Sequence, residues 1–207
     1  MCGIVGYVGE KQAANFLIDG LTKLEYRGYD SAGIAVFDGE KINVAKSVGR
    51  LAALKEKIKN NTPEGVMGIG HTRWATHGRP SDVNSHPHTD CSGKFAIVHN
   101  GIIENFMSLK EELIAKGHKF VSETDTEVVA HLIEDVYEGD FVEAVNKVLN
   151  RIEGSYSLAF MCQDYPDTLI CTKKDNPLVI GLGEGENFIA SDIPAIIAYT
   201  RRTYIMN

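Results

Sequence analysis

The start of the chain constrains its fold more than any other stretch. Cys2 follows the initiator Met1, and residues Gly3 to Val8 predict a strand because β-branched side chains recur along them. A strand in this position holds the chain end in place, whereas most termini fray. We therefore expect a fold in which a cysteine stands at the front of an ordered N-terminal strand.

Cys2 becomes a nucleophile and a base in one residue once Met1 is removed. Methionine aminopeptidase trims an initiator methionine when the next side chain is as small as cysteine. The new terminus carries a thiol with an ordinary pKa of about 8.5 and an α-amine with a pKa of about 7.7–8.0, so the amine can accept the thiol proton directly or through a water. The alternative is an inert thiol at a chain end, and the dipeptide alone does not decide between the two.

Length and composition describe an ordinary globular domain. A chain of 207 residues can bury one sizeable core, and 43% hydrophobic with 24% charged residues is a typical balance. The formal net charge of -7, without any basic stripe, argues against nucleic acid as a partner. The sequence has no cationic leader and no apolar run long enough for a membrane span, so we expect a cytoplasmic protein that does not contact the membrane.

Cysteine and histidine spacing gives no sign of a metal or disulfide framework. The four cysteines form no C-x-x-C pair, and Cys162 and Cys171 lie in strand-like runs typical of buried thiols. His86-Pro87-His88 with Cys91 matches no zinc pattern, so neither a metal nor a cofactor is expected. Gly181-x-Gly183-x-Gly185 predicts a hairpin turn rather than a phosphate loop, because the neighbouring glutamates would repel phosphate.

Hydrophobic periodicity predicts an α+β layered fold with antiparallel sheets between helices. A helix over Lys11 to Tyr26 is expected to end at Arg27-Gly28 with the glycine in a left-handed cap, and Asp38-Gly39 indicates a hairpin. One of Ser122, Thr124 and Asp125 is expected to cap a later helix. The other expected helices are 51–58, 103–116, 126–137 and 141–152, and the expected strands are 33–37, 41–47, 66–71, 95–99, 155–162, 168–172, 178–181, 187–190 and 203–206.

Residues 73–91 interrupt this pattern. They have no apolar periodicity, yet they hold the only tryptophan and three of the seven histidines. A long loop inside a compact domain is usually functional or disordered. The aromatic, imidazole and guanidinium groups in this one indicate a loop that contacts substrate.

Five stretches together resemble a known family: Met1-Cys2-Gly3-Ile4-Val5-Gly6, Arg27-Gly28-Tyr29-Asp30-Ser31-Ala32-Gly33, His71 to Gly78, His99-Asn100-Gly101 and Ser122-Glu123-Thr124-Asp125-Thr126-Glu127. In this order they resemble the glutaminase domain of class II glutamine amidotransferases, members of the N-terminal-nucleophile hydrolase superfamily. The match runs essentially from end to end. The sequence from Leu24 to Gly33 is most similar to the branch of the family that aminates fructose 6-phosphate.

The resemblance implies a fold and a reaction. The fold is a four-layer α/β/β/α sandwich with residues 1–207 as one glutaminase domain, and the reaction is hydrolysis of L-glutamine to glutamate and ammonia without a cofactor. Cys2 would form a γ-glutamyl thioester, while the Asn100 side chain and the Gly101 backbone N–H would form the oxyanion hole. Arg27 would orient the terminus, with a helix-end salt bridge as the alternative.

The substrate residues also follow from the resemblance. Arg73 offers a planar fork for the α-carboxylate of glutamine, and Asp125 offers a counter-charge for its ammonium group. Trp74 is expected in a lid, with a core anchor as the alternative, and the alternative for Asp125 is a helix cap. Thr76 and His77 match positions that contact the bound amino acid.

The resemblance further implies partners outside this chain. C-terminal sugar isomerase domains would receive the ammonia and aminate fructose 6-phosphate to glucosamine 6-phosphate, and the full-length enzyme would be a homodimer. Four alternatives stay open on sequence grounds: an aminophosphoribosyl-forming amidotransferase, an asparagine-forming one, a non-catalytic glutamine sensor, and an N-terminal-cysteine hydrolase that acts on another amide.

Overall fold

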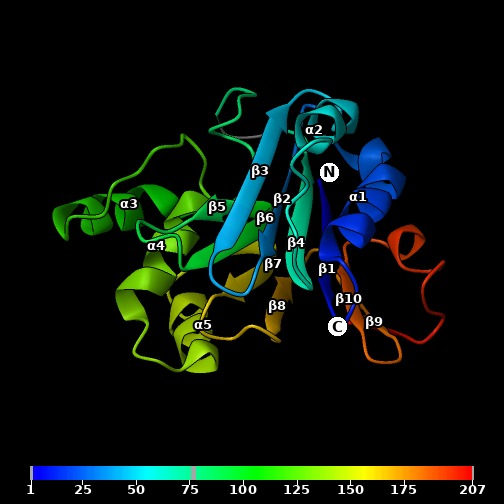
Figure 1. The fold of residues 1–207 in the computed structure, drawn as a ribbon. Helices are drawn as coiled ribbons and strands as arrows, with labels where there is room; N and C mark the ends of the chain where they lie inside the picture. Colours follow the sequence, from blue (N-terminus) through cyan, green and yellow to red (C-terminus); the bar gives the residue numbers. More distant parts are fainter. Residues whose placement is uncertain (1, 76–77, 207) are drawn as a thin grey trace.

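Two antiparallel sheets lie face to face between two groups of helices (Figure 1). The computed structural model describes residues 2–75 and 78–206. The larger sheet has seven strands in the order β11-β9-β10-β1-β4-β2-β3, and the smaller has four in the order β5-β6-β7-β8. The strands are β1 Gly3–Val8, β2 Ser31–Phe37, β3 Ile42–Val48, β4 Met67–Arg73, β5 His88–Thr89, β6 Phe95–Ile103, β7 Gly154–Cys162, β8 Leu169–Lys174, β9 Val179–Leu182, β10 Asn187–Ala190 and β11 Thr203–Ile205.

Helices cover the outer face of each sheet. The α-helices are α1 Ala13–Leu24, α2 Leu51–Ile58, α3 Phe106–Ala115, α4 Glu127–Val136 and α5 Phe141–Leu149, with short 3-10 helices at Glu25–Arg27 and Ile193–Ala195. The first two pack on the larger sheet, while α3, α4 and α5 lie on the far side of the smaller one (Figure 1). Across the described ranges, no helix has the length and apolar character needed to cross a membrane.

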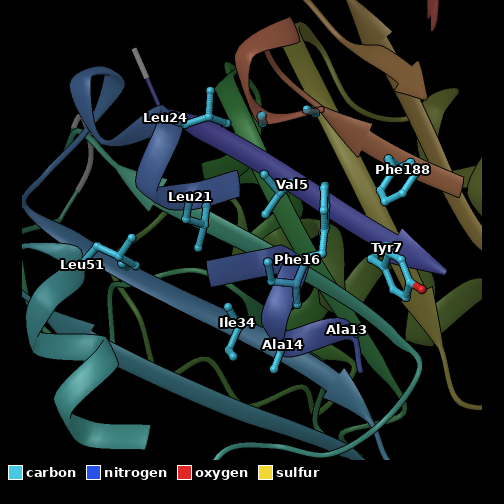
Figure 2. Packing of buried hydrophobic residues seen from close by; sticks show 14 of the residues in the cluster. Val5, Tyr7, Ala13, Ala14, Phe16, Leu21, Leu24, Ile34, Leu51 and Phe188 are labelled. Carbon is cyan, nitrogen blue, oxygen red and sulfur yellow. The ribbon is translucent and has the colours of Figure 1, made fainter. Parts of the chain in front are cut away.

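Three separate apolar clusters fill the three interfaces between these four layers. Strand β1 supplies two of them because its side chains alternate: Val5 packs under α1, and Ile4 faces the smaller sheet. Figure 2 shows the first cluster, where Phe16 and Leu21 from α1 lie over the strands. The cluster between the sheets joins side chains such as Ile69 with residues of β6 and β7. The predicted α/β/β/α sandwich is confirmed.

Strand β1 lies inside the larger sheet, where it pairs with β10 on one edge and β4 on the other. Gly3 lies opposite Thr72, so Cys2 continues toward the end of β4. Arg73 at that end pairs with Ser31, the first residue of β2. The register therefore brings the front of β1 next to Arg73, although 70 residues separate them in the chain.

The predicted helix starts needed correction at two places. The helix expected from Ile103 begins at Phe106 instead, since Ile103 is the last residue of β6 and pairs with Gly154. None of Ser122, Thr124 and Asp125 caps α4, whose N-cap residue is Thr126 without a side-chain bond.

Glu127 supplies the missing contacts at the start of α4. Its carboxylate accepts hydrogen bonds from the N–H groups of Val121 at 2.8 Å and Ser122 at 2.7 Å. A side chain in the first turn of α4 therefore accepts hydrogen bonds from the backbone of the preceding loop. The sequence had predicted the opposite, a side chain of the loop that accepts from the backbone of the helix.

Gly28 is not the left-handed cap that the sequence predicted. Its backbone is extended, with φ -169 and ψ 139. A Cβ atom on Gly28 would lie 2.7 Å from the carbonyl oxygen of Arg73. Glycine is needed here because the backbone of Arg73 passes too close for a side chain, and not because the position requires a left-handed conformation.

The long loop is shorter and better fixed than expected. Arg73 at the start of the predicted loop belongs to β4, and His88 near its end belongs to the short strand β5. Within it, the Asp82 carboxylate accepts from the N–H of Val48 at 2.7 Å and pairs with Lys57 at 2.8 Å. Arg73, Trp74 and His86 of this stretch line the cavity described below, and contact of the loop with substrate stays a prediction.

The packing of α1 predicts that truncation of a buried side chain lowers the free energy of unfolding much more than truncation of an exposed one. Leu21→Ala should lower the free energy of unfolding by about 2–5 kcal/mol, because it leaves a cavity under α1 in a fully buried cluster. Val142→Ala, on the exposed side of α5 with 58% of its surface accessible, is the matched control and should change it by less than about 0.5 kcal/mol. Urea unfolding measures both, and equal losses would contradict the layer assignment.

Candidate active site

A cavity of about 290 Å³ opens where β1 and β4 of the larger sheet meet β6 of the smaller one. Seven of the nine site residues predicted from the sequence line it, although they come from five separate stretches of the chain. They are Cys2, Arg27, Arg73, Trp74, Asn100, Gly101 and Asp125. The other two, Thr76 and His77, lie outside the described residues.

Cys2 is held at the cavity wall through its sulfur and its carbonyl group. The Trp74 N–H donates to Sγ at 3.2 Å. Arg27 Nε donates to the Cys2 carbonyl oxygen at 3.0 Å, while its Nη1 pairs with Asp192 at 3.1 Å. Arg27 therefore makes both kinds of contact that the sequence suggested, a bond to the N-terminal segment and an ion pair.

Burial controls the charge state of the Cys2 thiol. Desolvation raises its pKa above the ordinary value, and the hydrogen bond from the Trp74 N–H partly offsets this by favouring the thiolate. Asp30 raises the pKa further, whereas the Arg73 guanidinium lowers it. Because the thiol form is favoured, attack by this sulfur requires a base beside it.

His71 fixes the orientation of the Asn100 side chain. Burial lowers the pKa of His71 to about 3, so its ring is neutral. Its Nε2 lies 3.0 Å from the carbonyl oxygen of His99 and 3.0 Å from Asn100 Oδ1. Two acceptors require an N–H at Nε2, which assigns the tautomer. With Oδ1 held in this way, Asn100 Nδ2 points at Cys2 and donates to its carbonyl oxygen at 3.0 Å.

Gly101 must be glycine for two independent reasons. Its φ of +129 lies in a region that other residues rarely adopt, and a Cβ atom would lie 2.0 Å from the carbonyl oxygen of Ser155 on β7. The backbone at Gly101 therefore forms a bare edge of the cavity next to Asn100.

Arg73 and Asp125 bring opposite charges into the cavity while almost fully buried, with 3% and 4% of their surfaces exposed. Arg73 Nη2 donates to the Gly78 carbonyl oxygen at 3.1 Å. Asp125 Oδ2 accepts from the Ile103 N–H at 2.8 Å, which ties it to the end of β6. The helix-cap alternative for Asp125 is wrong, because that bond goes to a strand and not to α4.

Trp74 lies at the rim of the cavity rather than in a core. Its side chain keeps 48% of its surface exposed and contacts Tyr29 edge to face, with ring centroids 5.3 Å apart. The core-anchor alternative for Trp74 is therefore wrong, and the indole is placed where a cover over the cavity would be.

Sequence reasoning missed several residues that support this site. The His86 ring lines the cavity and stacks on His71 with centroids 4.1 Å apart. The Asp30 carboxylate accepts from Ser31 Oγ at 3.2 Å and from the Ala75 N–H, so it holds the segment that follows Arg73. A histidine at the end of an otherwise apolar strand, as in 66–71, was the available signal for His71.

A thiol at the front of a central strand, inside a sandwich of two sheets, defines the architecture of N-terminal-nucleophile amidotransferases. The sequence model of the glutamine amidotransferase domain family matches residues 71–198, and the chain belongs to this family. In the solved structures, the glutamine phosphoribosylpyrophosphate amidotransferase from B. subtilis superposes with a TM-score of 0.83 at 29% identity, covering 100% of this chain and 47% of that one.

Curated relatives are closer in sequence. The chain is 60% identical over 207 residues to the glutamine–fructose-6-phosphate aminotransferase (isomerizing) of Caldanaerobacter subterraneus subsp. tengcongensis, and 55% identical over 206 residues to that of Clostridium tetani. Each match covers 100% of this chain but 34% of the relative. The chain thus spans about a third of the length of these proteins, which contain further domains.

The neutral histidines around the cavity predict a pH-dependent stability. Burial lowers the pKa of His71, His86 and His88 below the value of about 6.5 in an unfolded chain, so unfolding takes up protons below that pH. The free energy of unfolding should therefore fall as pH drops below about 6.5, by up to about 1.4 kcal/mol per pH unit for each histidine.

Urea unfolding between about pH 5 and pH 7.5 measures this slope. His71→Gln should reduce the slope by the contribution of one histidine, because glutamine does not titrate. A flat profile over this range, or an unchanged slope in the variant, would show that the buried rings are not held neutral.

Proposed function

We propose that this chain hydrolyses L-glutamine to L-glutamate and ammonia through a thioester on Cys2. The observation that carries the proposal is the convergence of Cys2, Asn100, Arg73 and Asp125 on one cavity. Together they offer a thiol, amide donors, a cation and an anion, which are the groups needed to attack a side-chain amide and hold a zwitterion.

Removal of Met1 would give the thiol its base. With the Cys2 pKa raised by burial, the freed α-amine of the same residue would accept the thiol proton. The thiolate then attacks the amide carbon of glutamine, forming an S–C bond while the carbonyl oxygen takes up negative charge. Met1 itself lies outside the described residues, so this processing step is part of the proposal.

Asn100 Nδ2 and the Gly101 N–H would stabilise that oxyanion. His71 supports this role because it holds Asn100 Oδ1 and leaves Nδ2 directed at Cys2. Collapse of the intermediate breaks the C–N bond, and ammonia leaves with the proton from the Cys2 ammonium group. Water then attacks the thioester, releasing glutamate and restoring the thiol.

Arg73 and Asp125 would select an α-amino acid. Their burial keeps both charges out of bulk water. Ionic contacts to the substrate carboxylate and ammonium are stronger in such a buried site than in water. Thr76 and His77 would add contacts to the bound amino acid, and Trp74 at the rim would close over it and keep the ammonia from solvent. Arg27 would orient the terminus through its bond to the Cys2 carbonyl.

The acceptor is proposed from the relatives. Those at 55–60% identity are named for fructose 6-phosphate, against 29% for the phosphoribosylpyrophosphate amidotransferase. We infer that residues 1–207 form the glutaminase domain of a protein whose C-terminal sugar isomerase domains use the ammonia to make glucosamine 6-phosphate. A homodimer follows from the same family resemblance. The four free cysteines suit a reducing compartment such as the cytoplasm.

Replacement of the nucleophile separates an enzyme from a glutamine sensor. Cys2→Ala should abolish ammonia release from glutamine while the melting temperature stays near that of the parent, because alanine removes only the sulfur and keeps the carbonyl bonded to Arg27 and Asn100. Cys171→Ala is the matched control and should retain activity, since this thiol lies outside the cavity. A parent protein that binds glutamine but releases no ammonia would support the sensor, and near-parental turnover by Cys2→Ala would remove Cys2 from the mechanism.

Asp125→Asn tests recognition of the substrate ammonium. Asparagine keeps an oxygen that can accept from the Ile103 N–H but removes the charge, so kcat/KM for glutamine should fall about 10- to 100-fold. Glutaramate, which has the same amide and carboxylate but no ammonium group, is the control substrate and should lose little in the variant. Equal losses on both substrates would favour a hydrolase for another amide.

A further inference from the structure

A second group of reactive side chains lies outside the active-site cavity, against helix α4. Cys91 is in the turn after β5, His118 follows α3, and His131 and Glu134 stand one turn apart on α4. One ligand atom from each of the four lies within 4.8 Å of the others. None of the four lines the cavity that holds Cys2.

Three of the distances among these atoms are close to those in a tetrahedral metal site, and all of the atoms lie within 4.8 Å of one another. His118 Nδ1 lies 3.0 Å and His131 Nδ1 3.5 Å from Glu134 Oε2, and Cys91 Sγ lies 3.6 Å from His131 Nδ1. Zinc bonds of about 2.0–2.3 Å at tetrahedral angles place neighbouring ligand atoms about 3.3–3.6 Å apart. We propose that Cys91, His118, His131 and Glu134 bind one Zn²⁺ ion.

The groups around the cluster are arranged as in metal sites. Each histidine has its second nitrogen toward a carboxylate: His131 Nε2 lies 3.5 Å from Glu127 Oε1, and His118 Nε2 lies 3.7 Å from Asp135 Oδ1. A carboxylate that accepts from the second nitrogen of a ligating histidine fixes the ring. His131 Nε2 has no hydrogen-bond partner among the described residues, so its ring is free to turn toward Glu127 when a metal binds. The Lys119 N–H donates to Cys91 Sγ at 3.3 Å, a contact that fixes the position of the sulfur.

The donor set selects the kind of metal. One thiolate, two imidazoles and one carboxylate suit zinc, whereas magnesium and calcium require oxygen ligands. Four protein ligands complete a tetrahedral shell, which is typical of a structural site rather than a catalytic one. Cys91 is exposed, so an ion can enter from solvent, while His131 is buried on α4.

This inference revises the absence of metal expected from the sequence. That expectation weighed Cys91 together with His86 and His88, its neighbours along the chain. In the structure His86 stacks on His71, and His88 Nε2 lies 3.0 Å from Thr124 Oγ1. Cys91 instead faces residues that follow it by 27 to 43 positions, a spacing that matches no short zinc motif.

A bound zinc ion would join three segments that otherwise meet through hydrogen bonds, among them the bond from the Cys91 N–H to Glu134 Oε2 at 3.2 Å and the bond from the Lys119 N–H to Cys91 Sγ. It would tie the turn after β5 and the segment after α3 to α4, whose N-terminus follows Asp125. The Asp90 carboxylate already shapes the turn by accepting from the N–H groups of Ser92 at 3.0 Å and Phe95 at 2.7 Å. The ion would therefore stabilise the fold on the side of the smaller sheet.

The test measures metal directly and does not depend on glutamine hydrolysis. The chain is prepared with Cys2→Ala, which removes a competing thiol, then loaded with Zn²⁺ and dialysed. Elemental analysis should find one zinc per chain, and Co²⁺ in its place should give the intense d–d bands of tetrahedral cobalt with a thiolate charge-transfer band. Zinc at a hundredfold excess over its Kd should raise the Tm by about 5–10 °C.

Ligand variants in the same background decide where the ion binds. Cys91→Ser should abolish the charge-transfer band, and His118→Gln should weaken zinc binding at least tenfold if it removes a ligand. Cys171→Ser, which changes a thiol outside the cluster, is the matched control and should keep one zinc. Zinc far below one per chain in the parent, or binding unchanged in both ligand variants, would mean that the four side chains form only a hydrogen-bonded cluster and would overturn the proposal.

Discussion

The pairing of β1 with β10 and β4 is the constraint on which the site depends. A chain terminus ordinarily frays, but this one enters an interior position of a seven-stranded sheet, with Val5 packed toward the helices and Ile4 toward the second sheet. The position of Cys2, the residue before that strand, is therefore fixed. Cys2 can therefore act against groups carried by β4 and β6, which reach it only because the two sheets are stacked.

Electrostatics in the cavity follow from the same burial. The Cys2 thiol is kept protonated by desolvation, and the His71 ring is kept neutral for the same reason. Because the His71 ring is neutral, it can donate to Asn100 Oδ1 from Nε2 without adding a second positive charge near that of Arg73. Burial therefore favours the thiol form of Cys2, and the neutral His71 ring keeps Asn100 Nδ2 directed at the Cys2 carbonyl oxygen.

Local patterns predicted most of the elements, because amphipathic helices and β-branched runs are set by neighbouring residues. The sandwich itself and the grouping of Cys2, Asn100 and Asp125 were predicted through family resemblance, since no periodicity reveals which strands stack. Contacts between distant segments were missed. Gly28 was assigned to a left-handed helix cap although its close neighbour is the Arg73 carbonyl, and Cys91 was weighed with nearby histidines although it faces His131.

The central claim is that Cys2 becomes the first residue of the working chain and carries the glutamyl group during turnover. Mass spectrometry of acid-quenched protein mixed with glutamine tests it most directly. We expect a chain without Met1 that carries one glutamyl group, located on Cys2 by peptide mapping. A chain that retains Met1 and still releases ammonia at full rate, or a glutamyl group on any other residue, would contradict it.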